Sequence, residues 1–553
     1  MSSFKVEFPA DAKRIAVVAG MTALEAAAAA GLEIAADCAG RGTCGKCKAR
    51  ISGDISKPTE AEKKHLSVAE LAEGMRLACL TKILGATEIV FSVPVISSEI
   101  LPFRMDYDPD PRLICDPPSI AISGGSEDGQ AKLFGAAVDV GTTSLNARLA
   151  DLRTGRVLSS VVAANPQRLY GADVASRINF IIENKNGLEI LRSLVAGRVN
   201  EMIGKLAAEQ GGSAEDVRGI TLVGNPTMAH ALLGIDPRAI AESPYVPPTT
   251  QAMIFDANEA GLKAAAGARL FVLPAAAAYV GADALSASLR ARLNEPGGPR
   301  LLIDLGTNAE IMLSNGDDIF CCAAAAGPAL EGAHIRYGMS ATDGAIDRVD
   351  FRPEEELTTV NNEPAAGLCG TGLLDAISGL LSLGIILPGG RIVAEAPSEL
   401  PESVRSRVRE GAGGREFVLA RKGERGAARD IALTQQDIRE VQLAVGAIRA
   451  GIDLLLERAG VPGGEIETIY VAGALGTYLR SETALRVGIV PPIAPERVRF
   501  VGNAALDGAT EALLSGRHWD EARSLGDSVM YIELSAEPSF QARFAERMTF
   551  PAG

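Results

Sequence analysis

Four cysteines near the N-terminus have a spacing suited to binding metal. Cys38, Cys44 and Cys47 share one short loop and Cys79 stands far behind it, in the pattern C-x5-C-x2-C-x31-C. Four thiolates can hold two bridged irons, and the glycines at 40, 42 and 45 suit a backbone that wraps a cluster. A zinc site more often pairs two C-x2-C knuckles. The pattern therefore favours a [2Fe–2S] cluster over zinc or structural thiols.

The elements around these cysteines predict a small sheet crossed by one helix, the outline of a β-grasp domain, over residues 1–95. The expected elements are strands at Phe4–Phe8, Arg14–Val18, Lys48–Ile51 and Ile89–Val95, and an Ala-rich helix at Thr22–Ile34. This order resembles the [2Fe–2S] ferredoxins, and the x5 gap is similar to that of the adrenodoxin type. The resemblance implies that Cys38, Cys44, Cys47 and Cys79 ligate iron.

A second chemical pattern occurs twice, in Ala136–Ser144 (AAVDVGTTS) and Leu301–Ala309 (LLIDLGTNA). A tight Gly-Thr turn at a strand end offers N–H and hydroxyl groups to phosphate oxygens. A strand-end Asp can hold Mg²⁺ through water. We therefore expect Asp139 and Asp304 to position Mg²⁺ and water. The residues expected to contact phosphate are Gly141, Thr142, Thr143, Gly306, Thr307 and Asn308.

The order of the later segments points to a nucleotide-binding fold. Small-residue segments at Leu273–Ala287, Val471–Leu479 and Val501–Ala509 surround the second turn. This order resembles the acetate kinase, sugar kinase, heat-shock chaperone and actin superfamily, which implies ATP in a cleft between two ribonuclease-H-like lobes. By that resemblance Gly473 and Gly476 flank the adenosine. For these glycines close helix–strand packing is the alternative.

The two halves together resemble the reductive activators of corrinoid proteins, which join a ferredoxin domain to an actin-like ATPase. The matching segments include NPQRLYGADVASRI (165–178), GNPTMAHALLGIDP (224–237), AAGPALEGAHI (325–335) and GLCGTGLLDA (367–376). Departures are Leu330, Leu368, Thr371 and Leu475, and none removes a charged or ligand-type residue. The resemblance adds Gly327, Gly370 and Gly372 to the cofactor-binding set. Glu310 and Glu331 become candidates for orienting the attacking water, with a structural salt bridge as the alternative.

The function implied is ATP-dependent reduction of an inactive Co(II) corrinoid methyltransferase protein to Co(I), with the electron supplied by the cluster. The cofactors would be a [2Fe–2S] cluster, ATP and Mg²⁺. The partners would be the corrinoid protein and an upstream electron donor, and a homodimer is plausible. The alternatives are ATP-driven electron donation to another metalloenzyme, a ferredoxin-fused small-molecule kinase, and an electron-carrying module with an inert nucleotide site.

The expected domains are a ferredoxin-like domain at 1–95, a linker at 96–134, a first lobe at 135–300 and a second lobe at 301–553. Five prolines crowd the linker, which could be a packed strap or a mobile tether. The basic segment Arg405–Asp430 could be a surface insert or a dock for an acidic partner. Thr434–Gly460 is predicted to be a capped helix with an apolar stripe in the core.

Composition limits the other function classes. The chain has 553 residues, 47% of them hydrophobic, and its 54 Lys+Arg against 69 Asp+Glu give a net charge of −15. A negative balance disfavours nucleic acids and anionic membrane surfaces. Because the sequence shows neither an apolar signal core nor a spanning segment, we expect a cytoplasmic protein with reduced thiols.

Overall fold

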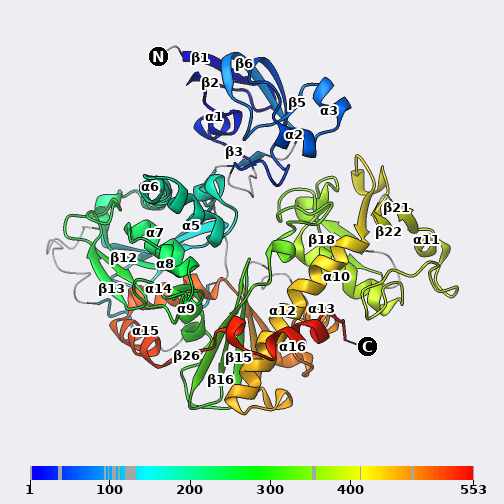
Figure 1. Ribbon diagram of the computed structural model, residues 1–553. Helices are drawn as coiled ribbons and strands as arrows, with labels where there is room; N and C mark the ends of the chain where they lie inside the picture. The colour runs from blue at the N-terminus through cyan, green and yellow to red at the C-terminus, as the bar shows by residue number, and fades with distance from the viewer. Residues whose placement is uncertain are drawn as a thin grey trace. The chain divides into compact units, whose positions relative to one another are not determined.

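The computed structural model describes residues 3–34, 40–92, 95–97, 99–102, 107–109, 113–118, 132–351, 356–411, 413–473, 475 and 479–551. The chain divides into two compact units (Figure 1). The first comprises Met1–Ala282 with Ala509–Asp520, and the second comprises Asp283–Gly508 with Glu521–Gly553. None of the helices within these described ranges is long and apolar enough to cross a membrane.

The N-terminal part is a five-stranded mixed sheet, which confirms the predicted β-grasp. Its strands run in the order β2 (Lys13–Val18), β1 (Ser3–Phe8), β6 (Ile83–Phe91), β4 (Lys48–Ile55) and β5 (Met75–Leu77). β1 and β6 are parallel, and the other pairs are antiparallel. The helices are α1 (Ala23–Ala29), α2 (Glu60–His65) and α3 (Val68–Ala72). Alternate residues of β6 are buried, so one face of the sheet supplies the core.

Two predicted boundaries in this part are wrong. The helix expected to reach Ile34 ends at Ala29, because Gly31 adopts a left-handed φ of 71°. Leu32–Ile34 then forms β3, whose Leu32 and Ile34 side chains are buried and which pairs with β7 (Val95–Ser97). The last expected strand, Ile89–Val95, is the end of the longer β6 followed separately by β7.

The rest of the first unit is built on a seven-stranded sheet. Its order is β13 (Met253–Asp256), β14 (Arg269–Val272), β12 (Val217–Gly224), β9 (Phe134–Val140), β10 (Ser144–Asp151), β11 (Val157–Ala164) and β8 (Leu101–Pro102). β12 is parallel to β9 and β14, whereas β9, β10 and β11 are antiparallel neighbours. The helices are α5 (Val174–Glu183), α6 (Gly187–Glu209), α7 (Pro226–Leu233), α8 (Arg238–Ala241) and α15 (Gly516–Ser528), the last shared with the second unit.

The second unit repeats this strand arrangement. Its sheet runs β25 (Val498–Gly502), β24 (Thr468–Ala472), β15 (Arg300–Leu305), β16 (Ala309–Ser314), β17 (Ile319–Ala324) and β26 (Met530–Tyr531). β24 is parallel to β15, while β15, β16 and β17 are antiparallel neighbours. The order β24-β15-β16-β17 therefore matches β12-β9-β10-β11, and the predicted pair of ribonuclease-H-like lobes is confirmed.

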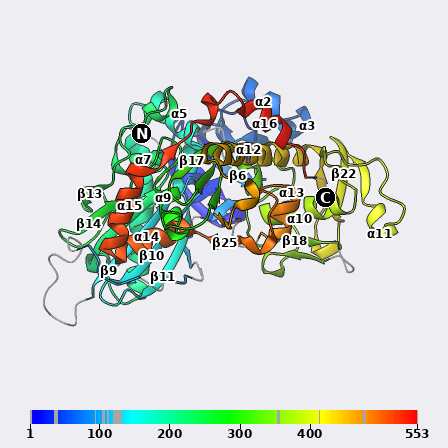
Figure 2. The same ribbon diagram turned by 90° about the horizontal axis from the view of Figure 1, so that it is seen from below.

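Helix α12 (Gln435–Ala459) is the main packing element of the second unit. Thr434 caps it and Gly460 ends it in a left-handed conformation, as predicted. It lies on β16 and β17 and beside α16 (Phe540–Arg547) (Figure 2). A Cβ on Gly451 would lie 2.9 Å from Cδ1 of Ile311, and one on Gly446 would lie 2.9 Å from Cγ of Met548. Glycine at these two positions therefore lets α12 pack closely on Ile311 of β16 and on Met548, which follows α16.

Smaller elements complete the second unit. Its other helices are α9 (Ala282–Arg290), α10 (Gly370–Ser382), α11 (Glu402–Arg405), α13 (Ser481–Val487) and α14 (Ala504–Leu514), the last shared with the first unit. Two small sheets have the orders β19 (Glu356–Thr359), β18 (Ala345–Asp350), β20 (Gly367–Leu368) and β21 (Val408–Gly411), β22 (Gly414–Ala420), β23 (Ile431–Thr434).

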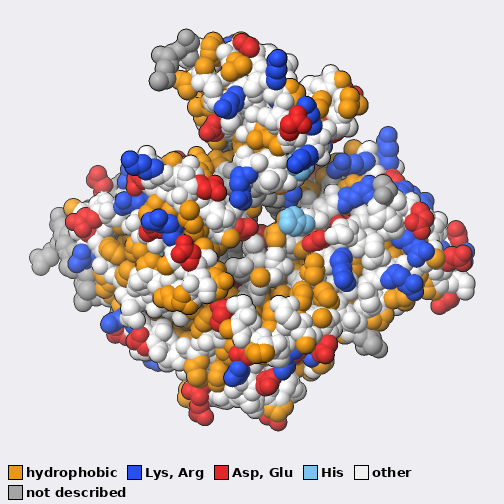
Figure 3. Space-filling model, viewed as in Figure 1, with side chains coloured by type: hydrophobic (Ala, Val, Ile, Leu, Met, Phe, Trp, Pro, Cys, Tyr) orange, Lys and Arg blue, Asp and Glu red, His pale blue; other side chains and the backbone are white. Residues whose placement is uncertain are grey.

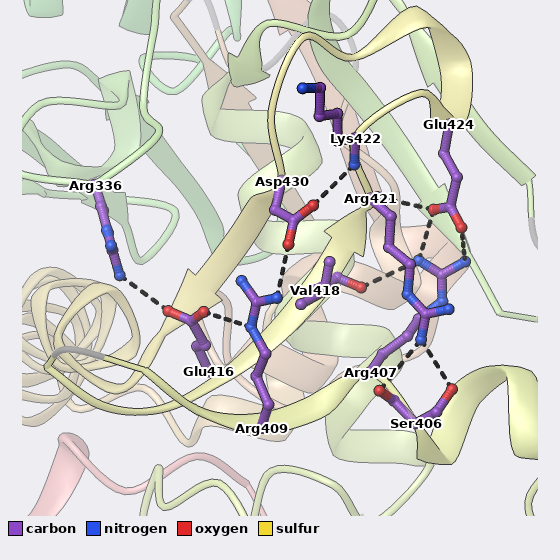
Figure 4. A network of polar contacts seen from close by, with 10 residues as sticks. All are labelled: Arg336, Ser406, Arg407, Arg409, Glu416, Val418, Arg421, Lys422, Glu424 and Asp430. Carbon is purple, nitrogen blue, oxygen red and sulfur yellow. Dashed lines mark hydrogen bonds and ion pairs between the residues drawn. The ribbon is translucent and has the colours of Figure 1, made fainter.

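The basic segment around β21 and β22 uses much of its charge internally (Figure 4). Arg407 pairs with Glu424 at 2.9 Å, and Arg409 pairs with Glu416 at 2.8 Å. Further pairs are Arg409–Asp430, Arg405–Glu402 and Arg415–Glu410. Acidic and basic side chains accordingly mix over this region in Figure 3. These pairs favour a surface insert over a dock for an acidic partner.

Several described stretches of the predicted linker are bonded to the first unit. Leu101 and Pro102 form β8, which pairs with Val162 and Val161 of β11. The N–H of Asp116 donates to the carbonyl of Leu514 at 3.0 Å, and the Asp116 carboxylate accepts from Ser515 at 2.8 Å. These contacts favour a packed strap for the described stretches.

Candidate functional site

The cluster loop places its described cysteines at the edge of the N-terminal core. Cys47 and Cys79 are buried and Cys44 is partly exposed. The N–H of Ala78, next to Cys79, donates to the carbonyl of Cys47 at 2.9 Å, so the two cysteine segments are joined directly. Cys38 lies outside the described residues. None of the described cysteines is in a disulfide.

Glycines let this loop lie close to its surroundings. Gly42 and Gly45 both have left-handed φ values, 71° and 68°. A Cβ on Gly42 would lie 2.5 Å from Cδ1 of Leu80, and one on Gly45 would lie 2.8 Å from Nδ1 of His65. Only glycine fits both the conformation and the space. The sequence argument that the loop glycines serve a wrapped backbone agrees with this geometry.

The described residues Cys44, Cys47 and Cys79 supply three of the four thiolates that a [2Fe–2S] cluster needs. No group of three or more His, Cys, Asp or Glu side chains that could hold one metal ion is found among the described residues. In a [2Fe–2S] cluster each of the two bridged irons takes two of the four thiolates. Loop, thiols and spacing thus fit the cluster, with Cys38 as the fourth expected ligand.

A buried carboxylate supports the Cys79 turn, and the sequence argument missed it. Glu62 and Arg76 are both buried and form a two-point pair, with Nε to Oε1 at 2.8 Å and Nη2 to Oε2 at 3.1 Å. Glu62 also accepts from the N–H groups of Leu77 and Thr59. Burial alone would raise the pKa of Glu62, but the hydrogen bonds from Arg76 and these N–H groups lower it. Its ionised form therefore holds α2 against the end of β5.

The first phosphate turn follows β9. Asp139 is nearly buried, and Oδ2 accepts from Nδ2 of Asn146 on β10 at 3.2 Å. Gly141, Thr142 and Thr143 connect the two strands. A Cβ on Gly141 would lie 2.6 Å from the carbonyl oxygen of Ser144, so this tight turn requires glycine. The structure brings together all four residues that the sequence predicted here.

Three residues that the sequence argument missed hold this turn from behind. Asn165 donates from Nδ2 to the carbonyl of Gly141 at 2.8 Å, and its N–H donates to the carbonyl of Thr143 at 3.0 Å. Arg177 donates to the carbonyl of Thr142. Asn225 donates to Oγ1 of Thr142 at 3.0 Å. Asn165 and Asn225 each precede a proline at a helix start, and that capping pattern was the available signal.

The direction of these carbonyls sets the direction of the N–H groups. In a trans peptide the C=O of one residue and the N–H of the next point to opposite sides. Because the carbonyls of Gly141, Thr142 and Thr143 point to Asn165 and Arg177, the following N–H groups point the other way. That side of the turn is where a phosphate would be bound.

The second phosphate turn has more acidic side chains around it than the first. Asp304 and Glu310 are cross-strand partners on β15 and β16, the positions that Asp139 and Asn146 hold in the first unit. Burial, and then the charges of Asp283 and Asp304, raise the pKa of Glu310 well above its ordinary value. Asp283, on α9, was not predicted. Glu331 accepts from Oγ1 of Thr307 at 3.0 Å, so this candidate carboxylate contacts the predicted turn.

The remaining predicted glycines fall into two groups. Gly473 lies against the second turn, since a Cβ there would be 2.4 Å from the carbonyl oxygen of Leu305 and 2.9 Å from Oδ1 of Asp304. Gly327 has a φ of 74° and open space around it, and Gly306 closes the turn by donating to the Asn308 carbonyl at 3.1 Å. Gly476 lies outside the described residues.

Gly370 and Gly372 instead face backbone. A Cβ on Gly370 would lie 1.9 Å from the carbonyl oxygen of Leu330, and one on Gly372 would lie 2.1 Å from that of Ile346. Close packing of α10 explains both residues. Their contact with a nucleotide stays a prediction.

Comparisons with known families match each part of the chain. Residues 9–84 match the 2Fe-2S iron-sulfur cluster binding domain. Residues 134–296 match the RACo middle region. Residues 298–553 match the C-terminal domain of RACo, the ASKHA domain. Fold and site therefore define a ferredoxin-type domain joined to an ASKHA-type ATPase.

Individual relatives narrow this class to a family. The corrinoid activation enzyme RamQ of Eubacterium limosum is 32% identical over 417 residues, which cover 75% of this chain and 70% of that protein. The [Co(II) methylated amine-specific corrinoid protein] reductase of Methanosarcina barkeri is 27% identical over 439 residues, which cover 72% of this chain and 73% of that protein. A solved reductive activator for corrinoid, iron-sulfur protein superposes with a TM-score of 0.69 at 31% identity, over 99% of this chain and 98% of that one. The chain belongs to the family of reductive activators of corrinoid proteins.

Proposed function

We propose that this chain uses ATP to drive one electron from its [2Fe–2S] cluster to the cobalt of a corrinoid methyltransferase protein. Co(II), the inactive form, gains the electron and becomes Co(I), the cluster is oxidised, and an upstream one-electron donor reduces it again. The observation that carries the proposal is the presence of a ferredoxin-type cysteine loop and two Asp-x-Gly-Thr turns in one chain. Family membership supports it.

We assign roles residue by residue as part of this proposal. Cys38, Cys44, Cys47 and Cys79 would hold the cluster, which supplies one-electron transfer. Asp139 and Asp304 would position Mg²⁺ through water. The N–H and hydroxyl groups of the two turns would bind nucleotide phosphates. Glu310 and Glu331 would orient the attacking water, and Gly473 and Gly476 would flank the adenosine.

The energetics explain why a nucleotide is needed. A ferredoxin-type cluster has a potential near roughly −400 mV, which is not reducing enough for easy transfer to Co(II). Moving one electron through 100 mV is worth about 2.3 kcal/mol. A nucleotide that binds one conformational state more tightly can supply a few kcal/mol. ATP would thus favour the state in which the cobalt is easier to reduce.

The finer partner assignments belong to the same proposal. The corrinoid protein is the electron acceptor, a reductase or ferredoxin is the donor, and a homodimer is the proposed assembly. The compartment that fits reduced thiols is the cytoplasm.

An anaerobic assay tests the function. The reconstituted chain, a low-potential reductant, MgATP and the Co(II) form of either a methylamine-type corrinoid protein or a corrinoid iron–sulfur protein are mixed, with one mixture lacking the chain. Co(I) should appear in the visible spectrum only with chain and ATP together, and the corrinoid protein should stimulate ATP hydrolysis. Phosphorylated metabolite without Co(I) would identify a kinase, and Co(I) formation independent of ATP would contradict the coupling.

A further inference from the structure

Arg177 is a fully buried arginine in the first turn of α5. Its guanidinium donates to the carbonyl of Gly171 at 3.0 Å, to Oε1 of Gln167 at 3.2 Å and to the carbonyl of Thr142. It also approaches Sδ of Met228. All of these acceptors are neutral. Within the described ranges, Arg177 has no ion-pair partner.

Burial of such a charge is unfavourable. A cation in the interior costs free energy unless a carboxylate compensates it. Burial, and then repulsion from Arg168, lower the pKa of Arg177 to about 9, and Asp173 opposes this shift. The guanidinium therefore still carries its charge at neutral pH. Asp173 uses Oδ1 to cap the N–H of Ser176 at 2.7 Å.

The local chain is shaped to bring this charge to the phosphate turn. A Cβ on Gly171 would lie 2.9 Å from the backbone nitrogen of Arg177 and 2.4 Å from Oγ of Ser176. Glycine at position 171 therefore lets the start of α5 approach, and its carbonyl accepts from Nε of Arg177. The guanidinium then reaches the Thr142 carbonyl from inside the unit.

One peptide group separates the cation from the phosphate side of the turn. The Thr142 carbonyl faces Arg177, so the N–H of Thr143 in the same peptide faces away. The positive charge and the peptide dipole both favour an anion beyond that N–H. An anion bound there would compensate Arg177 across the peptide.

We propose that Arg177 is a positioning residue for nucleotide phosphates: it fixes the turn at 139–144 and supplies a permanent buried positive charge behind it. The inference rests on the proposed function, since it assumes that this turn binds ATP. The alternative is that Arg177 is only a polar staple between α5 and the turn.

The test compares ligands that differ in phosphate charge. Dissociation constants of MgATP, ADP and AMP are measured by titration calorimetry for the full chain, for Arg177→Gln and for Arg177→Lys. With a buried charge removed, Arg177→Gln should weaken ATP about tenfold or more and AMP by about threefold or less. Arg177→Lys should still bind ATP more tightly than ADP and ADP more tightly than AMP, because it keeps the positive charge.

Arg148→Gln is the matched control. Arg148 is also buried in the first unit, but it bonds to Ser160 on β11 and to Thr510 on α14. Its replacement should leave the ATP-to-AMP affinity ratio unchanged. Thermal unfolding without nucleotide shows whether each variant folds.

Three outcomes would overturn the assignment. In the first, Arg177→Gln loses equal affinity for ATP, ADP and AMP. In the second, Arg177→Gln loses no affinity for any of them. In the third, Arg177→Gln does not fold, and Arg177→Lys no longer binds ATP more tightly than ADP and AMP. A wild-type chain that binds no ATP would instead refute the proposed function, so the two failures are distinguishable.

Discussion

At the scale of single residues, the pKa values of two carboxyl groups shift in opposite directions. Glu62 is held ionised by Arg76 and by backbone N–H groups beneath the cluster turn. Glu310 lies opposite Asp304 and is driven towards its protonated form. The difference follows from the neighbours, since one carboxylate faces donors and the other faces acids.

Replacing Glu62 by Gln should destabilise the ferredoxin part. The variant leaves Arg76 buried without its counter-ion, which typically costs about 3 kcal/mol or more. Loss of the cluster's visible absorption during denaturant unfolding measures the effect in the full chain. Glu60→Gln is the control, because Glu60 is exposed and forms a surface ion pair with Lys63. Equal unfolding curves for the two variants would contradict the supporting role of Glu62.

Glu310 predicts a pH dependence of stability. Its folded pKa is raised above the ordinary value of 4.5, so above that pH the native state binds a proton that the unfolded chain has released. Stability should therefore fall as pH rises from about 4.5 towards the raised pKa. Glu310→Gln should become increasingly more stable than the wild type over this range.

Unfolding midpoints at several pH values, without Mg²⁺ or nucleotide, measure this difference. The exposed Glu465 offers a control, and Glu465→Gln should follow the wild type. Parallel pH profiles for the wild type and Glu310→Gln would show that the native protein does not hold the extra proton.

At the scale of elements, parallel strands place the functional turns. Gly224 at the end of β12 pairs with Val140 at the end of β9, so Asn225 begins α7 beside Thr142. Ala472 at the end of β24 pairs with Asp304, which brings Gly473 to the second turn. In each unit the parallel strand thus ends beside the Asp-x-Gly-Thr turn, and the glycine there, Gly224 or Gly473, faces the carbonyl oxygen of the residue that follows the Asp.

Helix α10 supplies a prediction at this scale. Gly370→Ala forces a Cβ against the Leu330 carbonyl, so the helix must move and stability should fall by about 1–3 kcal/mol, even without nucleotide. A Cβ on Gly389 would have nothing within 4 Å, so Gly389→Ala should leave the stability unchanged. Denaturant unfolding measures the stability of both variants. A Gly370→Ala chain of normal stability that loses only ATP affinity would favour nucleotide contact over packing.

At the scale of the whole molecule, an electron carrier and an ATPase share one acidic chain. Cys79→Ser should remove the cluster and abolish Co(II) reduction, because one of four expected iron ligands is lost. ATP affinity should stay within about threefold, since Cys79 belongs to the core of the ferredoxin-type part. Visible absorption, Co(I) formation and nucleotide titration measure the three properties.

Cys115→Ser is the matched control for this variant. Cys115 is partly exposed and donates to the carbonyl of Leu152, outside the cluster motif. It should retain both the cluster and the reduction. Continued Co(II) reduction by Cys79→Ser would refute the proposed electron path.

The local patterns were sufficient to predict much of the fold, and they supplied the proposed site residues. Strand, Asp and Gly-Thr lie within nine residues of each other in Ala136–Ser144, and three cysteines lie within one loop. The capped helix α12 and the β-grasp could also be predicted, because period and capping are short-range properties. Two boundaries were misplaced in that part: the end of α1, where Gly31 turns the chain into β3, and the last strand, which divides into β6 and β7.

Contacts between distant segments were decided by the tertiary structure alone. Arg177 stands 35 residues from Thr142, Asn225 stands 83 residues from it, and Glu62 stands 14 residues from Arg76. In the linear sequence these residues look like ordinary exposed polar side chains, because the residue type alone does not show which polar side chains will be buried. In the folded chain these side chains have lost water and hydrogen-bond to a specific set of partners, which only the three-dimensional packing determines.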